Sequence, residues 1–175
     1  LGRIEPRKKH LLLLNQWRNI ARTLRSDAIP RLKISGRRGW ENEQIIDLLE
    51  RSPALAPQID EIDNCSDNEL AAILRGASGL LMPSFSEGYG MPIAEALAAG
   101  TPVIASDIAA HREAGGDAPD FRDPLDGPGW QRAILDYAEE GPQRQAQVER
   151  LKAWRAPEWG AHLDIAQSVI DRVSA

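Results

Sequence analysis

The sequence predicts an α/β fold in which a parallel β-sheet carries helices on both faces. Short apolar segments bounded by Gly and Pro alternate with amphipathic segments about every 20–25 residues. Because neighbouring parallel strands need a crossover connection, this alternation indicates βαβ units. Hydrophobic residues make up 42% and charged residues 27% of the 175 residues, which is ordinary for a globular chain and argues against disorder.

The first part of the chain predicts two helices and two strands. A helix over 8–26 is expected because Leu13, Trp17, Ile20 and Leu24 recur at helical spacing and Pro30 then interrupts the pattern. The elements that follow are a strand over 32–35, a helix over 42–51 and a weak strand over 58–62 that contains two acidic residues.

The middle of the chain begins with a capping box, in which Ser66 and Glu69 satisfy each other's backbone amides and start a helix over 67–75. Buried strands are predicted over 79–84 and 102–106. Between them, a helix over 92–99 begins at a proline and ends before a glycine. The remaining predictions are helices over 129–139, 142–154 and 157–173, and loops over 53–57 and 117–129.

This pattern predicts a sheet domain over 1–140 and C-terminal helices over 141–175 that pack on it. All five tryptophans are expected to be packing anchors. His10 and His111 are expected on helix surfaces, and His162 in a structural role within the last helix.

Several function classes are excluded or disfavoured. The longest apolar run is only Leu11–Leu14, too short to span a membrane, and the single cysteine allows no internal disulfide. No secretion signal is visible, so a cytoplasmic setting is expected. The sequence lacks a dinucleotide-binding fingerprint, a P-loop, a nucleophile elbow and any His/Cys spacing typical of a metal site. It also lacks an Asp-x-Asp triplet, so no metal and no obligatory cofactor are predicted.

Charge is distributed unevenly. Residues 1–40 carry a net charge of +9, whereas the rest of the chain carries −14. A solvated basic helix face and an anion site near the N-terminus both explain this. Nucleic acid is a less attractive partner, because the pI is about 5.3.

Residues 85–97 carry the strongest functional signal. They run from the end of a buried strand through a glycine-rich turn into a helix, so Gly88, Gly90 and Met91 can offer backbone amides to an anion. Glu87 and Glu95 lie on either side of this turn. A nucleotide sugar would satisfy both features, with a diphosphate for the amides and hydroxyls for the carboxylates. The alternative is that Glu95 is a solvated helix residue and Glu87 a partner of the helix dipole.

A second cluster lies at the N-terminus. If Gly2 ends a first strand, Arg3 and Lys8 flank the first βα loop on the same side of the sheet as Glu87. Arginine and lysine both bind phosphate, and basic residues at a helix start oppose the helix dipole unless an anion lies there.

These motifs resemble the C-terminal half of a retaining glycosyltransferase of the two-domain, Rossmann-like GT-B type, in the group 1 or family 4 class. The resemblance rests on GRIEPRK (2–8) and SEGYGMPIAEALAAGTPVIASD (86–107), which contains the E-x7-E motif of the family. It is supported by the segments GRRGWENE (36–43), SDNELAAILRGAS (66–78), AAHREAGGDA (109–118) and PEWGAHLDIAQSVI (157–170). Only Leu1 stands where the family has a hydrophobic strand before the first loop, so the first strand is expected to be truncated.

The resemblance implies roles for individual residues. Arg3 and Lys8 would bind the donor diphosphate and stabilise its negative charge as it leaves. Glu87 would contact the transferred sugar and Glu95 the ribose. Amides of Gly90 and Met91 would face the diphosphate or the sugar. The base would lie near Asn64 and Cys65, with Gly36 and Arg37 beside it.

The implied reaction moves a sugar from a UDP-, GDP- or dTDP-linked donor to an acceptor hydroxyl with retention, in polysaccharide or lipid-linked glycan synthesis. The implied partners are an N-terminal GT-B domain and, through it, a glycan or lipid-linked acceptor at the inner face of the membrane; the isolated domain is expected to be inactive. Two alternatives are a catalytically silent module on the same fold and a Rossmann-type dehydrogenase, which the missing fingerprint disfavours.

Overall fold

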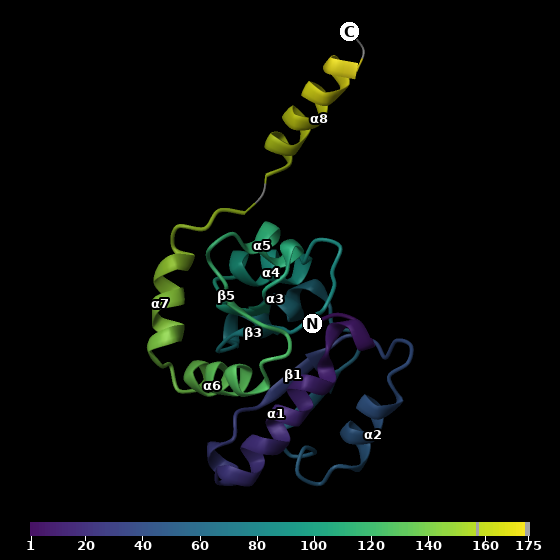
Figure 1. Ribbon diagram of the computed structural model, residues 1–175, viewed down its shortest axis with the longest axis vertical. Coiled ribbons are helices and arrows are strands. Elements are labelled where there is room, and N and C mark those ends of the chain that lie inside the picture. The colour runs from purple at the N-terminus through teal and green to yellow at the C-terminus, as the bar shows by residue number, and fades with distance from the viewer. Residues whose placement is uncertain (157, 174–175) are drawn as a thin grey trace.

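The computed structural model describes residues 1–156 and 158–173 as parallel strands alternating with helices (Figure 1). The strands are β1 (Leu32–Ser35), β2 (Ile59–Ile62), β3 (Leu80–Met82), β4 (Val103–Ser106) and β5 (Asp120–Arg122). The helices are α1 (His10–Thr23), α2 (Glu43–Arg51), α3 (Asp67–Gly76), α4 (Met91–Ala98), α5 (Ala109–Gly115), α6 (Gly127–Ala138), α7 (Pro142–Leu151) and α8 (Trp159–Val173), with 3₁₀ turns at Pro6–Lys8 and Ser26–Ala28.

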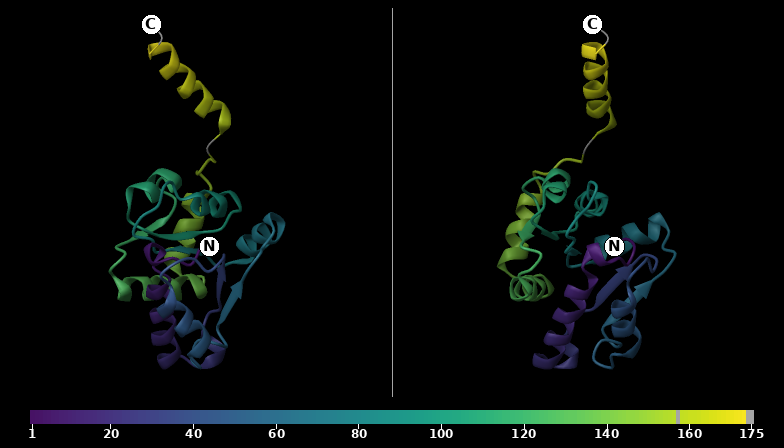
Figure 2. Two further views of the ribbon diagram at one scale, coloured as in Figure 1. Left: turned by 90° about the vertical axis from the view of Figure 1, so that its right-hand side faces the viewer. Right: turned by 45° about the vertical axis from the view of Figure 1, so that its right-hand side comes forward.

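The strands form two parallel sheets, β1-β2 and β3-β4-β5. The N-terminal residues lie between the two sheets in every view (Figures 1 and 2). Gly2 donates its amide to the Ser35 carbonyl at 2.8 Å, and Ile4 donates to the Arg37 carbonyl at 3.0 Å. Residues 2–4 therefore run parallel to the end of β1, as expected of a truncated first strand. The sequence predicts one sheet, but the strands form two, with these residues between them.

Two apolar clusters hold the elements together. One joins α1, β1 and α6 and includes the buried Trp17 and Trp130, whereas the other joins α3, α4, β3 and β4. Trp154 packs at the edge of the second cluster. Trp40, predicted to be a packing anchor, is instead 56% exposed. The side chains of Trp159 and His162, and the predicted helix start at Pro157, lie outside the described part of the chain.

Charges inside the first two strands pair across the sheet. The parallel register places Lys33 opposite Asp60, and the Lys33 Nζ lies 3.4 Å from an Asp60 carboxylate oxygen. Arg38 binds Glu61 through two nitrogens at 2.8 and 2.9 Å. The acidic residues that weaken the strand prediction at 58–62 are therefore ion-pair partners, with Asp60 on the face of Lys33 and Glu61 on the opposite face.

The predictions for residues 117–129 and for the two histidines, His10 and His111, are wrong. Residues 117–129 were predicted to be a loop, but Asp120–Arg122 forms β5, whose pairing with β4 supplies the order that its short charged sequence does not indicate. His10 and His111 were predicted on helix surfaces, yet they are only 6% and 0% exposed. The His111 Nδ1 lies 2.9 Å from the Ser106 carbonyl, which fixes the ring under the end of β4.

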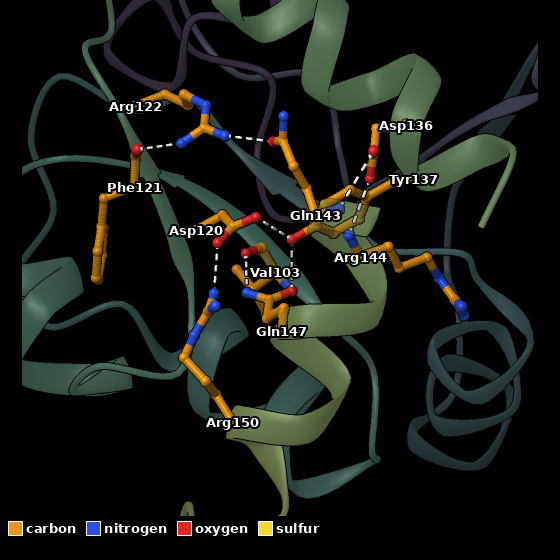
Figure 3. A network of polar contacts seen from close by, with 10 residues as sticks. All are labelled: Val103, Asp120, Phe121, Arg122, Asp136, Tyr137, Gln143, Arg144, Gln147 and Arg150. Atoms are coloured by element: carbon orange, nitrogen blue, oxygen red, sulfur yellow. Dashed lines mark hydrogen bonds and ion pairs between the residues drawn. The ribbon is translucent and has the colours of Figure 1, made fainter. Parts of the chain in front are cut away.

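The two C-terminal helices differ in their packing. Gln147 anchors α7 because its side-chain amide bonds both backbone groups of Val103 in β4 (Figure 3). α8 was also expected to pack on the domain, but Figures 1 and 2 show it projecting away, with Leu163, Ile165 and Ile170 exposed. None of the described helices combines the length and the apolar character needed to cross a membrane.

Candidate active site

The candidate site lies where the parallel strands end. In parallel sheets with crossover helices, the carboxyl ends of the strands meet at one edge, where ligands bind. β1 leads into Gly36 and Arg37, β2 leads into Asn64, and β3 leads into Glu87. The first loop reaches the same edge, because the Phe85 amide donates to the Arg7 carbonyl at 2.8 Å.

Glu87 is the centre of a compact charged cluster. Its carboxylate accepts hydrogen bonds from the Lys8 Nζ at 2.9 Å, the Ser84 hydroxyl at 2.8 Å and the Arg7 guanidinium at 2.9 Å. The Glu87 and Lys8 side chains are 8% and 10% exposed, whereas that of Arg7 is 41% exposed. Arg7 also donates to the buried Glu5 carboxylate at 3.0 Å, so the cluster is largely withdrawn from water and its two cations are balanced by two carboxylates.

The protonation state of Glu87 follows from these contacts. Burial alone would raise the pKa of its carboxyl group, but the hydrogen bonds from Lys8, Ser84 and Arg7 together outweigh burial and lower it. Glu87 is thus a carboxylate at neutral pH. Because each carboxylate oxygen has two lone pairs, Glu87 can accept further hydrogen bonds from a ligand hydroxyl.

The start of α4 lies three residues further along the chain. Gly90 is its N-cap at φ 102°, a left-handed conformation that glycine adopts readily, and Met91 is 57% exposed. No side chain caps this terminus, but Pro92 has no amide hydrogen and the Ile93 amide donates to the Gly90 carbonyl at 2.8 Å. The amides that can face a ligand at the positive end of the helix dipole are therefore those of Gly90 and Met91. Gly88, in the intervening turn, has open space where a side chain would begin. The turn therefore leaves room for a ligand against backbone amides.

Glu95 and Arg3 lie at the same edge but are exposed. The charges of Glu95, Glu87 and Lys8 all act on the Leu1 amino group, which places these side chains around the start of the chain. Within the described residues, Arg3 forms no ion pair. Arg7, which the sequence motif contains but spacing alone did not single out, is the arginine that reaches Glu87. Ser84 was also missed, and its place at the end of a predicted strand was the available signal.

A second group of predicted residues lies beyond β1 and β2. Arg37 donates to the Asn64 side-chain oxygen at 3.0 Å, and Asn64 has a positive φ of 56°. Cys65 and Asn64 line a hollow of about 360 Å³. Gly36, at φ 142°, lets the Gly2 carbonyl approach so closely that a side chain there would collide with it. The structure thus brings Gly36, Arg37, Asn64 and Cys65 together, on the β1-β2 side of the Glu87 cluster.

This arrangement can bind an anion and hydroxyl groups at once. Lys8, Arg7 and the α4 amides attract negative charge, while Glu87 offers an acceptor that stays ionised. Among the described residues, no group of three or more His, Cys, Asp or Glu side chains is placed to hold a metal ion. The groups that face this site are cations, backbone amides and carboxylates.

Known proteins are similar to this chain in sequence and in fold. The chain is 32% identical over 150 residues to the O-antigen chain mannosyltransferase B of Escherichia coli, covering 86% of this chain and 39% of that protein. It is 32% identical over 112 residues to the O-antigen chain mannosyltransferase RfbU of Salmonella typhimurium, covering 62% of this chain and 30% of that protein. This chain thus spans about two fifths or less of these relatives.

Solved structures agree at the level of fold. WaaG, a glycosyltransferase involved in lipopolysaccharide biosynthesis, matches with a TM-score of 0.66 at 17% identity, over 87% of this chain and 41% of WaaG. A TarM variant from S. aureus, in complex with Fondaparinux, alpha-GlcNAc-glycerol and UDP, matches with a TM-score of 0.70 at 16% identity, over 87% of this chain and 31% of TarM. A family model described as "Glycosyl transferases group 1" matches residues 1–137. The chain therefore belongs to the group 1 glycosyl transferases.

Proposed function

We propose that this chain is the donor-binding half of a retaining glycosyltransferase that moves a hexosyl group from a nucleoside diphosphate sugar to an acceptor hydroxyl. The observation that carries this proposal is the buried Glu87 carboxylate, held between Lys8 and Arg7 beside the uncapped start of α4. Few ligands other than a nucleotide sugar present a diphosphate and several hydroxyls within such a short span.

Each part of the donor has a matching group. Lys8, together with Arg3 or Arg7, binds the diphosphate, and the amides of Gly90 and Met91 bind its remaining oxygens. Glu87 accepts from hydroxyls of the transferred sugar, and Glu95 accepts from the ribose. The base lies towards Arg37, Asn64 and Cys65, where the hollow beyond β2 offers space.

The same groups favour the chemical step. When the bond between the anomeric carbon and the phosphate oxygen breaks, its electron pair moves onto the diphosphate. Cations and amides that already face this position stabilise the added charge without having to reorganise. The acceptor oxygen forms the new bond to the anomeric carbon on the face that the diphosphate leaves, which retains the anomeric configuration, and the proton of the acceptor hydroxyl passes to the departing phosphate oxygen. No resident metal is required in this scheme.

The relatives suggest the biological setting. Two of them are O-antigen mannosyltransferases and WaaG acts in lipopolysaccharide biosynthesis, so we propose a bacterial surface glycan as the product. The proposed partners are an N-terminal GT-B domain and a glycan or lipid-linked acceptor, at the cytoplasmic face of a membrane. TarM crystallised with UDP, which makes UDP one of the nucleotides to test.

Calorimetric titration of the 175-residue chain tests donor binding. UDP, GDP, dTDP and ADP, each with and without a sugar, are titrated into the wild type and into Lys8→Gln, Glu87→Gln and a control, Lys152→Gln. Lys152 is an exposed lysine at the end of α7 that pairs with Glu149. We expect Lys8→Gln to weaken the best nucleotide roughly 10- to 100-fold, the value of one charge-assisted hydrogen bond.

Glu87→Gln separates the roles of the cluster. It removes the carboxylate that pairs with both Lys8 and Arg7, although Arg7 keeps its ion pair with Glu5. We therefore expect it to preserve or improve binding of the free nucleoside diphosphate while weakening the nucleotide sugar. Equal affinities across all variants would refute the assignment. Comparing Arg3→Gln with Arg7→Gln identifies the second cation. If nucleotide sugars bind but the full-length protein transfers no sugar, the chain is a silent module on the same fold.

A further inference from the structure

A buried carboxylate beside the candidate site has no role in the binding scheme above. Glu5 belongs to the first loop, and its side chain is only 9% exposed. It precedes the 3₁₀ turn at Pro6–Lys8, but its carboxylate forms no hydrogen bond that caps this turn. Among the described residues, its ion-pair partner is Arg7, whose Nε donates to the carboxylate at 3.0 Å. Because a buried charge is costly unless it is paired, this contact indicates that Glu5 acts on Arg7.

The loop after β1 packs directly against Glu5. A Cβ at Gly39 would lie 2.8 Å from the Glu5 Cγ and 2.9 Å from the Ile4 carbonyl oxygen. The Gly39 amide donates to that carbonyl at 3.0 Å, and the Asn42 side chain donates to the carbonyls of both Ile4 and Gly39. Since these backbone contacts fix the loop beside Glu5, the carboxylate offers Arg7 a partner that is itself held in place.

Arg7 divides its donors between the protein and the solvent. Its Nε bonds Glu5, and one terminal nitrogen, Nη1, donates to the Ser86 carbonyl and to the Glu87 carboxylate at 2.9 Å each. The other terminal nitrogen, Nη2, meets no acceptor within residues 1–156 and 158–173. The side chain is 41% exposed. Since a guanidinium has five N–H groups, the two on Nη2 remain for a ligand.

These contacts fix the direction of the guanidinium plane. A free arginine side chain samples many rotamers, whereas one that is held at both Nε and Nη1 loses little further freedom when a ligand binds. The backbone is held as well, because the Phe85 amide donates to the Arg7 carbonyl at 2.8 Å. The free Nη2 is therefore oriented within the cluster of Glu87 and Lys8, where we propose that the diphosphate binds.

We propose that Glu5 is a positioning residue for donor binding, which holds the Arg7 guanidinium through Nε so that Nη2 faces the diphosphate. The inference rests on the proposed function and deepens it, because it selects Arg7 as a cation that binds the diphosphate together with Lys8. When the Arg7 Nη1 leaves Glu87 for the ligand, the bond from Nε to Glu5 remains and the guanidinium turns about it. Glu5 itself does not touch the donor.

Calorimetric titration of the 175-residue chain tests this role. The probe is whichever of UDP, GDP, dTDP and ADP binds the wild type most tightly. For Glu5→Gln, charge and positioning predict opposite results. Removing a negative charge beside an anion site should strengthen binding, whereas loosening Arg7 should weaken it. We expect positioning to dominate, with a roughly 2- to 10-fold loss of affinity, the usual cost of ordering one long side chain.

Two comparisons isolate the path through Arg7. In the Arg7→Gln background, Glu5→Gln should no longer weaken binding, because the residue on which it acts is gone. Asp60→Asn is the matched control, since it also removes a carboxylate from an arginine, Arg31, but near the end of the sheet where β1 and β2 begin. It should leave the nucleotide affinity unchanged. Melting temperatures show whether each variant is folded.

A second variant, Arg7→Lys, keeps the inference testable if Glu5→Gln does not fold. Lysine keeps the charge but lacks the planar fork that reaches several partners in fixed directions, so we expect a loss of affinity similar to that of Glu5→Gln. Unchanged or higher affinity in both variants would overturn the inference, as would an equal loss from Glu5→Gln with and without Arg7. If Lys8→Gln still weakens binding in that case, the proposed function stands and only the role of Glu5 is wrong. If the wild type binds none of the four nucleotides, both are refuted.

Discussion

The Gln147 side chain forms two hydrogen bonds with β4 that a neighbouring strand would normally form. Its side-chain oxygen accepts from the Val103 amide at 2.8 Å, and its nitrogen donates to the Val103 carbonyl at 2.6 Å (Figure 3). The register of β5 begins with Asp120 opposite Ile104. One residue earlier, Pro119 would lie opposite Val103, and proline has no amide to donate. The Gln147 carboxamide replaces the ladder hydrogen bonds that β5 does not make to Val103. We therefore predict that Gln147→Leu is severely destabilising.

The expected loss in the free energy of unfolding follows from the burial of these groups. Val103 and Gln147 are both fully buried, so removing the carboxamide leaves a backbone donor and a backbone acceptor without water or partner. Each unsatisfied group costs about 1–3 kcal/mol, which predicts a loss of about 2–6 kcal/mol in the free energy of unfolding. Tyr137 also loses an acceptor at 2.7 Å but keeps Asp120 at 2.8 Å.

Urea denaturation of Gln147→Leu and of Gln145→Leu, an exposed position on the same helix, measures this loss. The control should change by no more than about 0.5 kcal/mol. Gln147→Glu adds a sharper comparison, because a carboxylate cannot donate to the Val103 carbonyl but a protonated carboxyl group can. The free energy of unfolding of Gln147→Glu should therefore approach that of the wild type as the pH falls. A loss below about 1 kcal/mol for Gln147→Leu would refute the reasoning.

Three further predictions concern stability. Gly36→Ala places a side chain against a neighbouring carbonyl at φ 142° and should cost about 2 kcal/mol or more, measured by urea denaturation; an unchanged midpoint would contradict it. Burial, and then two nearby positive charges, lower the pKa of His10 from 6.5 to about 4, so only the unfolded chain binds this proton between those pH values. Stability should therefore fall by about 3 kcal/mol as pH drops through that window, with a shallower slope in His10→Gln. Ser66→Ala removes the capping box of α3 and should lower Tm by about 2–5 °C, whereas Asn68→Ala should not.

The sequence predicts those elements whose signal is local. β1 appears over 32–35 as expected, and the capping box at Ser66 forms with both of its hydrogen bonds. β5 has no such signal, because only Phe121 between two charged residues distinguishes it from a loop, and the edge of β4 supplies its order. His111 is buried because α5 packs under the end of β4, a tertiary fact that one short polar segment does not reveal.

In the candidate site, too, the sequence predicts the features that have a local signal and misses the others. The E-x7-E spacing and the glycine turn locate Glu87 and the start of α4 from sequence. Which cation meets Glu87 depends on a 3₁₀ turn at Pro6–Lys8, followed by Lys9 in a left-handed conformation. That turn directs Arg7 and Lys8 together towards Glu87, while Arg3 stays exposed. Chain spacing cannot encode this choice, because it depends on backbone dihedral angles.

Under the proposed function, the Glu87 cluster also predicts the order in which the parts of a donor bind. A buried ion pair is a weak source of stability, since apolar side chains of similar volume often serve a fold as well. Here Lys8, Arg7 and Ser84 occupy three of the four lone pairs of the Glu87 carboxylate, which leaves one for a ligand hydroxyl. A diphosphate would draw Lys8 and Arg7 towards itself and expose Glu87 to the hydroxyls of the attached sugar, which would replace the lost hydrogen bonds. The diphosphate and the sugar should therefore bind with positive coupling, so that a free sugar binds the empty site poorly and a nucleoside diphosphate prepares it.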